Sequence, residues 1–165
     1  MEKKIGLAPV IGDNARILIL GSLPGDESLR RQEYYGNPKN MFWRVLGNIL
    51  DEAAPDSYPD KVEFLKRHGI ALWDVLKAAE REGSLDANIL NEEFNDLEGL
   101  LLEHPSISVI ALNGGKAEKS FIKYLRRHPS LREKRIVPCK STSMMSLCAG
   151  WTLERLSEQW KEILK

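Results

Sequence analysis

The chain has 165 residues, 42% of them hydrophobic, and its 24 basic and 24 acidic side chains give a formal net charge of zero. This length suits a single domain over residues 1–165, and the balanced charge excludes a protein that holds nucleic acid by net charge alone. Because the basic N-terminus precedes no sustained apolar segment and no stretch could cross a bilayer, we expect a cytoplasmic protein without a signal peptide or membrane contact.

The cysteines and histidines argue against a metal centre. Cys139 and Cys148 are the only cysteines, and their spacing matches neither a zinc nor an iron–sulfur ligand set. His68, His104 and His128 each precede Gly or Pro at the end of a predicted helix, where a cation interacts favourably with the helix dipole. We therefore expect no metal, no other cofactor and no Ser-His-Asp mechanism.

The first third of the chain predicts a strand, a long loop and a helix. Residues 17–20 are an unbroken apolar run that ends at Gly21, which predicts a buried strand. Residues 21–39 predict a loop that is longer than an ordinary connection. Apolar residues at helical spacing predict a helix over 41–50, with Asn40 as its N-cap.

The middle of the chain gives a mixed signal. Asp60 begins a pattern like a capping box and predicts a helix that ends at Gly69. Residues 70–76 are apolar and fit either a strand or a helix, so both assignments stay open. Asn91 predicts the start of a helix over 92–103.

The last third repeats strand, turn and helix. The predicted elements are a strand over 107–112, a turn at 113–115, a helix over 116–127, a strand over 135–137, a loop over 138–150 and a helix over 152–164. Strands that alternate with helices predict an α/β fold, here one monomeric three-layer α/β/α sandwich with a mostly parallel central sheet. The loops after its strands should meet at one sheet edge, where such sheets bind ligands.

Two of these loops allow the backbone to approach a ligand closely. Pro24-Gly25 and Asn113-Gly114-Gly115 expose successive N–H groups, which can bind anions or carbonyl oxygens. Neither is a phosphate-binding P-loop or a dinucleotide fingerprint, because the required glycines and lysine are missing. A simple turn after a strand explains both segments equally well, so both interpretations stay open.

The loop over 138–150 combines hydroxyl groups with apolar side chains. Ser141-Thr142-Ser143, next to Lys140, could bind phosphates, although an ordinary polar loop is the alternative. Met144 and Met145 either fold back onto the core, which is the commoner outcome, or form a wedge that enters a base stack.

Aromatic side chains lie beside the first loop. Tyr35 and Phe42 could stack on a base, although Phe42 could equally belong to the core. Together with the polar loops, these rings indicate a pocket for a nucleotide or nucleic acid, without specifying its use.

Several segments of the chain are recognisable as motifs of one family. They are Pro38-Lys39-Asn40-Met41-Phe42-Trp43, Gly69-Ile70-Ala71-Leu72-Trp73-Asp74-Val75-Leu76, Arg81-Glu82-Gly83-Ser84-Leu85-Asp86 and Asn113-Gly114-Gly115-Lys116-Ala117. The first resembles motif one of the uracil-DNA glycosylase superfamily, and the others look like its DNA-deoxyinosine (hypoxanthine) branch. The resemblance implies an enzyme that flips a deaminated base out of DNA, hypoxanthine in preference to uracil, and hydrolyses its N-glycosidic bond without a metal or redox cofactor.

The resemblance also implies catalytic roles. The mismatch-specific branch carries a water-positioning asparagine where this chain has Leu23, which cannot orient water. The hypoxanthine branch relies on an asparagine that matches Asn40, and a positioned water can suffice because departure of the base builds positive charge on the sugar. Asp26 is the second catalytic candidate, as a carboxylate that stabilises this charge or accepts a proton.

Binding roles follow from the same loops. The groups expected to read the base are the Asn113 side chain and the backbone of Ser22, Leu23, Pro24 and Gly25, with Tyr35 or Phe42 stacking on it. The residues expected to contact DNA are Lys140, Ser141, Thr142 and Ser143, with Met144 and Met145 as the wedge. After Ser143 the chain departs from the family, whose members usually continue Ser-Pro-Ala.

Two alternatives stay open. One is a mismatch-specific uracil or thymine glycosylase. The other is a non-catalytic module that binds damaged DNA, which Leu23 and the altered segment after Ser143 make credible.

Overall fold

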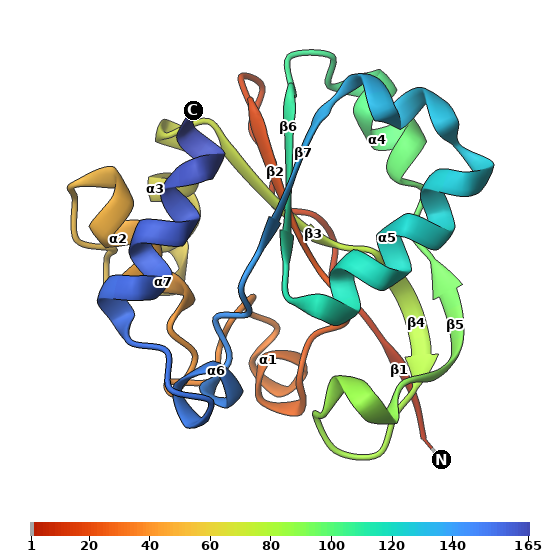
Figure 1. Ribbon diagram of the computed structural model, residues 1–165, viewed down its shortest axis with the longest axis horizontal. Helices are drawn as coiled ribbons and strands as arrows, with labels where there is room; N and C mark the ends of the chain where they lie inside the picture. Colours follow the sequence, from red (N-terminus) through yellow and green to blue (C-terminus); the bar gives the residue numbers. More distant parts are fainter. Residues whose placement is uncertain (1) are drawn as a thin grey trace.

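Two β-sheets organise the computed structural model, which describes residues 2–165 (Figure 1). The four-stranded sheet has the order β3-β2-β6-β7, all parallel, and consists of β2 (Ile17–Gly21), β3 (Ile70–Asp74), β6 (Val109–Asn113) and β7 (Arg135–Cys139). The three-stranded sheet has the order β1-β4-β5, all antiparallel, and consists of β1 (Lys3–Ile5), β4 (Leu76–Glu80) and β5 (Leu90–Phe94).

Helices cover both faces of the parallel sheet, as Figure 1 shows. The α-helices are α1 (Asp26–Arg31), α2 (Phe42–Leu50), α3 (Tyr58–Arg67), α4 (Leu97–Glu103), α5 (Gly115–Arg127), α6 (Met144–Cys148) and α7 (Leu153–Trp160). Short 3₁₀ helices span Asp86–Asn88, Pro129–Glu133 and Lys161–Leu164. Helices α2, α3 and α7 pack on one face and α4 and α5 on the other, which confirms the three-layer α/β/α fold.

Burial on both faces of the sheet explains why the central strand β2 is apolar at every position. Ile17 and Ile19 belong to the core beneath α2, α3 and α7, whereas Leu18 and Leu20 belong to the core beneath α4 and α5. Because successive side chains of a strand point to opposite faces, a strand covered on both faces is apolar at every position. All five residues of β2 are buried.

The antiparallel sheet was not expected from the sequence. Val75 joins β3 directly to β4, so the ambiguous run over 70–76 is strand rather than helix. The prediction of one helix over 92–103 was wrong in its first part, because β5 pairs with β4 there and Asn91 has a φ of 53°. The helix α4 begins later, where the Asp96 side chain accepts a hydrogen bond of 3.0 Å from the Gly99 N–H.

Other predicted boundaries also shift. Helix α3 begins at Tyr58 because Ser57, not Asp60, is its N-cap. Met41 occupies the N-cap position of α2, although the Asn40 side chain still accepts a hydrogen bond of 2.9 Å from the Phe42 N–H. The two loops expected to lack secondary structure contain the short helices α1 and α6. The three histidines occupy helix C-caps as predicted: His68, His104 and His128.

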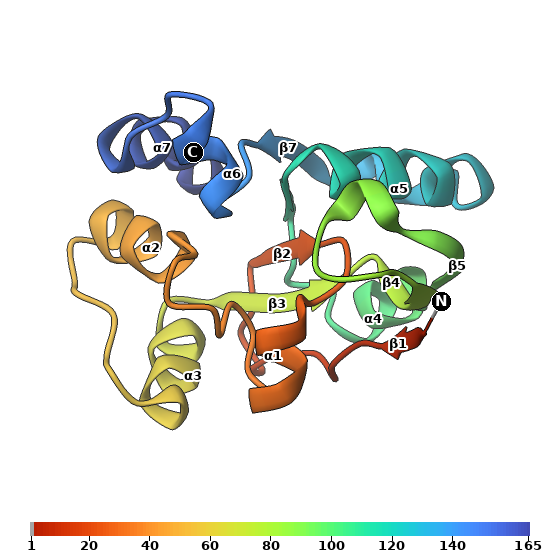
Figure 2. The same ribbon diagram turned by 90° about the horizontal axis from the view of Figure 1, so that it is seen from below.

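The strands β2, β6 and β7 end at the same edge of the parallel sheet, as expected. Gly21 pairs in register with Asp74, and Asn113 pairs with Cys139. The segments that follow these strands therefore lie together at one edge, which Figure 2 shows from below.

Gly114 shapes the turn between β6 and α5. Its φ of 95° and ψ of 166° lie in a region that is essentially restricted to glycine. A Cβ atom at this position would lie 3.1 Å from Cβ of Ser141. The turn thus brings the end of β6 against the segment after β7.

We predict that Gly114→Ala lowers the free energy of unfolding by about 1–3 kcal/mol, because alanine strains the backbone and crowds Ser141. Gly115→Ala is the matched control, since its added Cβ meets nothing within 4 Å and alanine favours the first turn of α5. Urea denaturation of both variants measures the difference. Equal stability of the two variants would contradict the role given to Gly114.

Candidate active site

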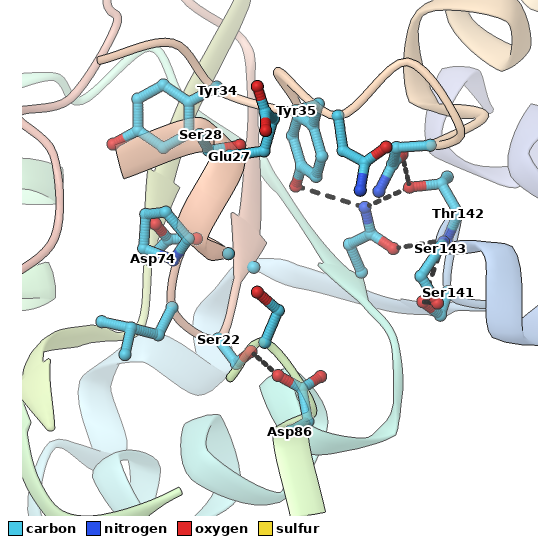
Figure 3. A pocket seen from close by; sticks show the side chains of 18 of the residues that line it. Ser22, Glu27, Ser28, Tyr34, Tyr35, Asp74, Asp86, Ser141, Thr142 and Ser143 are labelled. Atoms are coloured by element: carbon cyan, nitrogen blue, oxygen red, sulfur yellow. Dashed lines mark hydrogen bonds between the residues drawn. The ribbon is translucent and has the colours of Figure 1, made fainter. Parts of the chain in front are cut away.

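A cavity of about 190 Å³ lies at the carboxyl edge of the parallel sheet (Figure 3). Its walls come from the segment after β2, the ends of β3 and β6, the segment after β7 and the loop between β4 and β5. The lining includes most of the residues predicted from the sequence: Ser22, Leu23, Pro24, Gly25, Asp26, Tyr35, Asn40, Asn113, Ser141, Thr142 and Ser143.

Hydrogen bonds join three of these segments around Thr142. The Asn113 amide nitrogen donates to the Thr142 hydroxyl at 3.0 Å, and the Asn113 carbonyl oxygen accepts from the Thr142 N–H at 3.1 Å. The Thr142 hydroxyl donates to Oδ1 of Asn40 at 2.8 Å, and the Thr142 carbonyl accepts from the Met41 N–H. The segments after β2, β6 and β7 are therefore locked to one another.

The backbone donors in this network determine how both amides are oriented. A backbone N–H can only donate, so the atom that it meets must be the amide oxygen in Asn40 and in Asn113. Oδ1 of Asn40 accepts two hydrogen bonds, from the Phe42 N–H and from Thr142. Its Nδ2 group has no acceptor among the described residues, and Asn40 lines the cavity.

The structure changes the expected roles of Asn113 and Thr142. Both hydrogens of the Asn113 amide are engaged within the protein, one by Thr142 and one by the Tyr35 hydroxyl at 3.2 Å. Asn113 therefore positions its neighbours, and its donors are not free to read a base. Thr142 is only 1% exposed, so its buried side chain organises the network instead of contacting phosphate.

Tyr35 forms the aromatic wall of the cavity, and Phe42 does not. Phe42 is completely buried and stacks behind Tyr35, with ring centroids 3.9 Å apart and planes inclined by 15°. The expectation that Phe42 could itself stack on a base is thus wrong. Burial of the Tyr35 hydroxyl, followed by the nearby Asp74, raises its pKa well above the usual range, so the phenol stays neutral.

A buried arginine supports the turn that follows β2. The Arg81 guanidinium, 1% exposed, donates to the carbonyl oxygens of Leu23 and Pro24. The side chain of Leu23 packs in the core, so only its backbone faces the cavity. The N–H groups of Leu23 and Gly25 have no acceptor among the described residues, so they can donate to a ligand.

Asp26 is held by a lysine at the rim of the cavity. The Lys4 ammonium lies 2.5 Å from Oδ1 of Asp26 and also donates to the Gly83 carbonyl. The Asp26 N–H donates to the Ser84 hydroxyl. Asp26 therefore links the start of α1 to β1 and to the loop after β4, and its carboxylate already has a cationic partner.

Asp74, at the end of β3, has no cationic partner among the residues that the structure describes. It is 4% exposed and lines the cavity, and its Oδ2 is buried without a hydrogen bond. Burial, followed by the charge of Asp86, raises its pKa to about 7. Figure 3 shows Asp74 on the opposite side of the cavity from Thr142 and Ser143. The Asp74 carboxyl and the hydrogen-bond network around Thr142 thus lie on opposite sides of the cavity.

The segment after β7 divides into a buried and an exposed part. Ser141 and Ser143 are half-buried and line the cavity, with their hydroxyls 3.0 Å apart. Lys140 is exposed, and its ammonium lies 5.3 Å from the centre of the Trp151 ring. Its side chain thus extends beside the cavity, over Trp151.

Helix α6 presents apolar side chains to solvent. Met144 is 43% exposed and Met145 is 58% exposed, and Leu147 is exposed as well. The commoner outcome, in which the methionines fold back onto the core, is therefore wrong. Ser146 is the buried residue of this helix, and its hydroxyl donates to the Ser141 carbonyl at 2.6 Å.

Sequence reasoning gave no role to Asp74, Arg81 or Asp86. Asp86 accepts a hydrogen bond of 2.8 Å from the Ser22 hydroxyl and lies 3.5 Å from Arg81. Asp74 directly follows the apolar residues 70–73, a position that indicates the carboxyl end of a buried strand. It was missed because residues 70–76 were not assigned as a strand.

Two further observations concern residues 2–165. No three His, Cys, Asp or Glu side chains in this range lie close enough together to hold a metal ion. No helix within it has both the length and the apolar character needed to cross a membrane.

Comparisons with known proteins identify a family and close relatives of this chain. Residues 8–164 match the family model of the uracil DNA glycosylase superfamily. A hypoxanthine DNA glycosylase of Methanosarcina acetivorans is 50% identical over 115 residues, which cover 69% of this chain and 73% of the relative. A protein of the same description from Methanosarcina barkeri is 48% identical over 116 residues, covering 70% of this chain and 73% of that protein.

A solved structure is similar over the whole length. The solution NMR structure of a Methanosarcina acetivorans protein, described as a candidate uracil DNA glycosylase, has a TM-score of 0.82 and 38% sequence identity, and the match covers 99% of this chain and 100% of that one. The chain therefore belongs to the uracil DNA glycosylase superfamily.

Proposed function

We propose that this protein is a DNA glycosylase that releases a deaminated base, preferably hypoxanthine, and leaves an abasic site. Family membership and the names of the two Methanosarcina relatives support this proposal. The observation that carries it is the cavity, which combines an aromatic wall at Tyr35 with unpaired donors at Leu23, Gly25 and Asn40. Such a site can stack on a base and donate to its carbonyl and ring-nitrogen acceptors.

The base must leave the DNA stack to enter this cavity. The cavity is lined by the start of α1, by residues 141–143 before α6 and by Ser84 and Asp86 of the loop after β4, and a base that stays stacked in an intact duplex cannot enter it. The exposed methionines of α6 lie beside this opening, because Ser141 and Ser143 line the cavity and directly precede the helix. Met144 and Met145 enter the gap that the flipped nucleotide leaves, and apolar contact with the bases stabilises the opened duplex.

Asn40 holds the attacking water. Its Nδ2 group donates to the water oxygen, which leaves another lone pair for attack on C1′ of the sugar. Its Oδ1 is held by Thr142 and the Phe42 N–H, so the amide is oriented before the substrate binds. Positive charge on the sugar in the transition state makes weak activation of the water sufficient.

The first test uses DNA duplexes that contain one deoxyinosine or one deoxyuridine, followed by alkali. We expect strand scission at deoxyinosine only after alkali treatment, because the enzyme leaves an abasic site, and no scission in a matched duplex with deoxyadenosine. The absence of scission on every deaminated base would contradict the proposal. Preference for a mismatched uracil or thymine would favour the mismatch branch, and tight binding without base release would favour a non-catalytic module.

Asn40→Ala should lower the single-turnover rate of hypoxanthine release by at least about 100-fold, because the water loses its position. DNA affinity should change little. The variant also loses the hydrogen bonds that Oδ1 of Asn40 accepts from the Phe42 N–H and the Thr142 hydroxyl, which destabilises the fold by about 1–3 kcal/mol.

Asn48→Ala is the matched control for that loss, because Asn48 also lies at α2 and its amide bonds the Ser157 hydroxyl away from the cavity. It should retain activity. Near-normal release by Asn40→Ala would transfer the role to Asp26, and Asp26→Asn should then be the inactive variant.

Replacing both Met144 and Met145 by Ala should reduce release from duplex DNA by about tenfold more than release from single strands, because only the duplex must be held open. Thermal stability should stay nearly unchanged, since both side chains are largely exposed. Leu102→Ala removes another exposed apolar side chain, 76% exposed on α4, and serves as the control. Equal losses on duplex and single strands would contradict the wedge.

A further inference from the structure

The unpaired carboxyl of Asp74 calls for a chemical explanation. Its backbone is firmly placed, because the Asp74 carbonyl accepts a hydrogen bond of 2.8 Å from the Asn95 amide and Asp74 pairs in register with Gly21. Asp74 is only 4% exposed, yet no hydrogen bond or ion pair within residues 2–165 involves either of its carboxyl oxygens. Buried carboxyl groups normally have partners.

A ligand bound in the cavity could supply the missing hydrogen-bond partner of the Asp74 carboxyl. Asp74 lines the cavity together with Tyr34, Tyr35 and Gly21. A Cβ atom added to Gly21 would lie 2.6 Å from Oδ1 of Asp74 and 3.3 Å from the Tyr35 hydroxyl. The glycine therefore leaves space for both polar atoms, and a ligand that reaches this space meets a carboxyl and a phenol.

The charges around Asp74 favour its neutral form. Asp86, which accepts a hydrogen bond from the Ser22 hydroxyl, disfavours a second negative charge at Asp74. Arg81 is the opposing charge, and it forms no ion pair with Asp74 within residues 2–165. Desolvation is the largest cause of the raised pKa, Asp86 adds to it and Arg81 opposes it, so the pKa of Asp74 lies at about 7. Burial also raises the pKa of the Tyr34 and Tyr35 phenols, so both stay neutral, and no histidine lines the cavity.

A purine needs more help to leave than the attacking water alone can give. Breaking its N-glycosidic bond places an electron pair on the base, and a proton donated to the base neutralises this charge. None of the other groups assigned to the site supplies a proton, because an amide such as Asn40 is not an acid at neutral pH. Asp26 is paired with Lys4 at the rim.

We infer that Asp74 is a general acid that protonates the departing purine at N7. This inference rests on the proposed glycosylase function and adds a proton donor to it. As the bond from C1′ to N9 breaks, its electron pair moves to the base, and the Asp74 proton goes to N7. Neutral hypoxanthine then leaves, water adds to C1′, and the proton that the water loses restores the Asp74 carboxyl. The sum is nucleotide plus water giving an abasic site and free base.

The test is the pH dependence of single-turnover release from a deoxyinosine duplex, between about pH 5 and about pH 9. The protonated form of Asp74 is the active one, so the rate should be level below the pKa of about 7 and fall above it. The fall should approach about tenfold per pH unit. Asp74→Asn should be at least about 100-fold slower at low pH and should lack the falling limb.

Asp13→Asn is the control variant, because Asp13 is exposed and lies outside the cavity, and it should keep the wild-type profile. A near-normal rate for Asp74→Asn would overturn the inference, as would a wild-type rate that does not fall at high pH. If the wild-type protein releases no base at any pH, the proposed function itself fails, which is a different outcome.

A stability measurement separates catalysis from misfolding. Because the pKa of Asp74 is raised, the folded state binds more protons than the unfolded state between the ordinary value of 3.8 and about 7, and stability falls as the pH rises through this interval. Asp74→Asn carries no charge at any pH, so it should melt at a higher temperature than wild type at pH 8, with a smaller gain at pH 5. A variant that is inactive but at least as stable supports the role as an acid. A variant that melts well below wild type at both pH values would overturn it by making Asp74 a structural residue.

Discussion

The hydrogen bonds around Thr142 are the interaction on which the candidate site depends. Three segments far apart in the sequence meet there, and each supplies a different partner: Asn40 after β2, Asn113 at the end of β6 and Thr142 after β7. Removing one partner would leave buried polar atoms without a hydrogen bond, which is costly in a dry environment. The network therefore determines both the shape of the cavity and the orientation of the Asn40 amide.

The polar groups on one side of the cavity have hydrogen-bond partners, whereas the carboxyl on the other side does not. Around Thr142 nearly every polar atom has a partner, whereas Asp74 on the other side has none. Stability favours the first arrangement and opposes the second. A fold retains an unpaired buried carboxyl when the group is needed for binding or chemistry, and perturbed groups of this kind gather at functional sites. The core on both faces of β2 gives the fold the rigidity to hold such a group in place.

Leu23 stands where the mismatch-specific branch has a water-positioning asparagine, and the structure shows what the leucine does instead. An apolar side chain at this position packs into the core, while Arg81 binds the Leu23 and Pro24 carbonyls from behind. The turn after β2 thereby offers only backbone N–H groups to a ligand. The polar side chains proposed to take part in catalysis are instead Asn40, at the far end of the same segment, and Asp74 on the neighbouring strand.

The α/β class, the parallel strands and the edge at which their loops meet were all predictable from the sequence. Apolar runs such as residues 17–20 and amphipathic helices such as α5 are local patterns, so they can be read without knowing the fold. The family motif over residues 38–43 predicted Asn40 at the site, and the aromatic residues beside the first loop predicted Tyr35, for the same reason. Local signals failed at β5, where pairing with β4 overrides a helical pattern, and at the boundaries of α2 and α3.

The role of each polar group in the cavity follows from the folded structure and could not be predicted from the sequence. Asn113 and Asp74 look alike in sequence, because both directly follow an apolar strand. In the fold, the donors of Asn113 are used by Tyr35 and Thr142, whereas Asp74 faces the cavity unpaired. The availability of a hydrogen-bonding group depends on which distant side chains and solvent surround it, and burial also sets its pKa. Those surroundings exist only once the chain has folded.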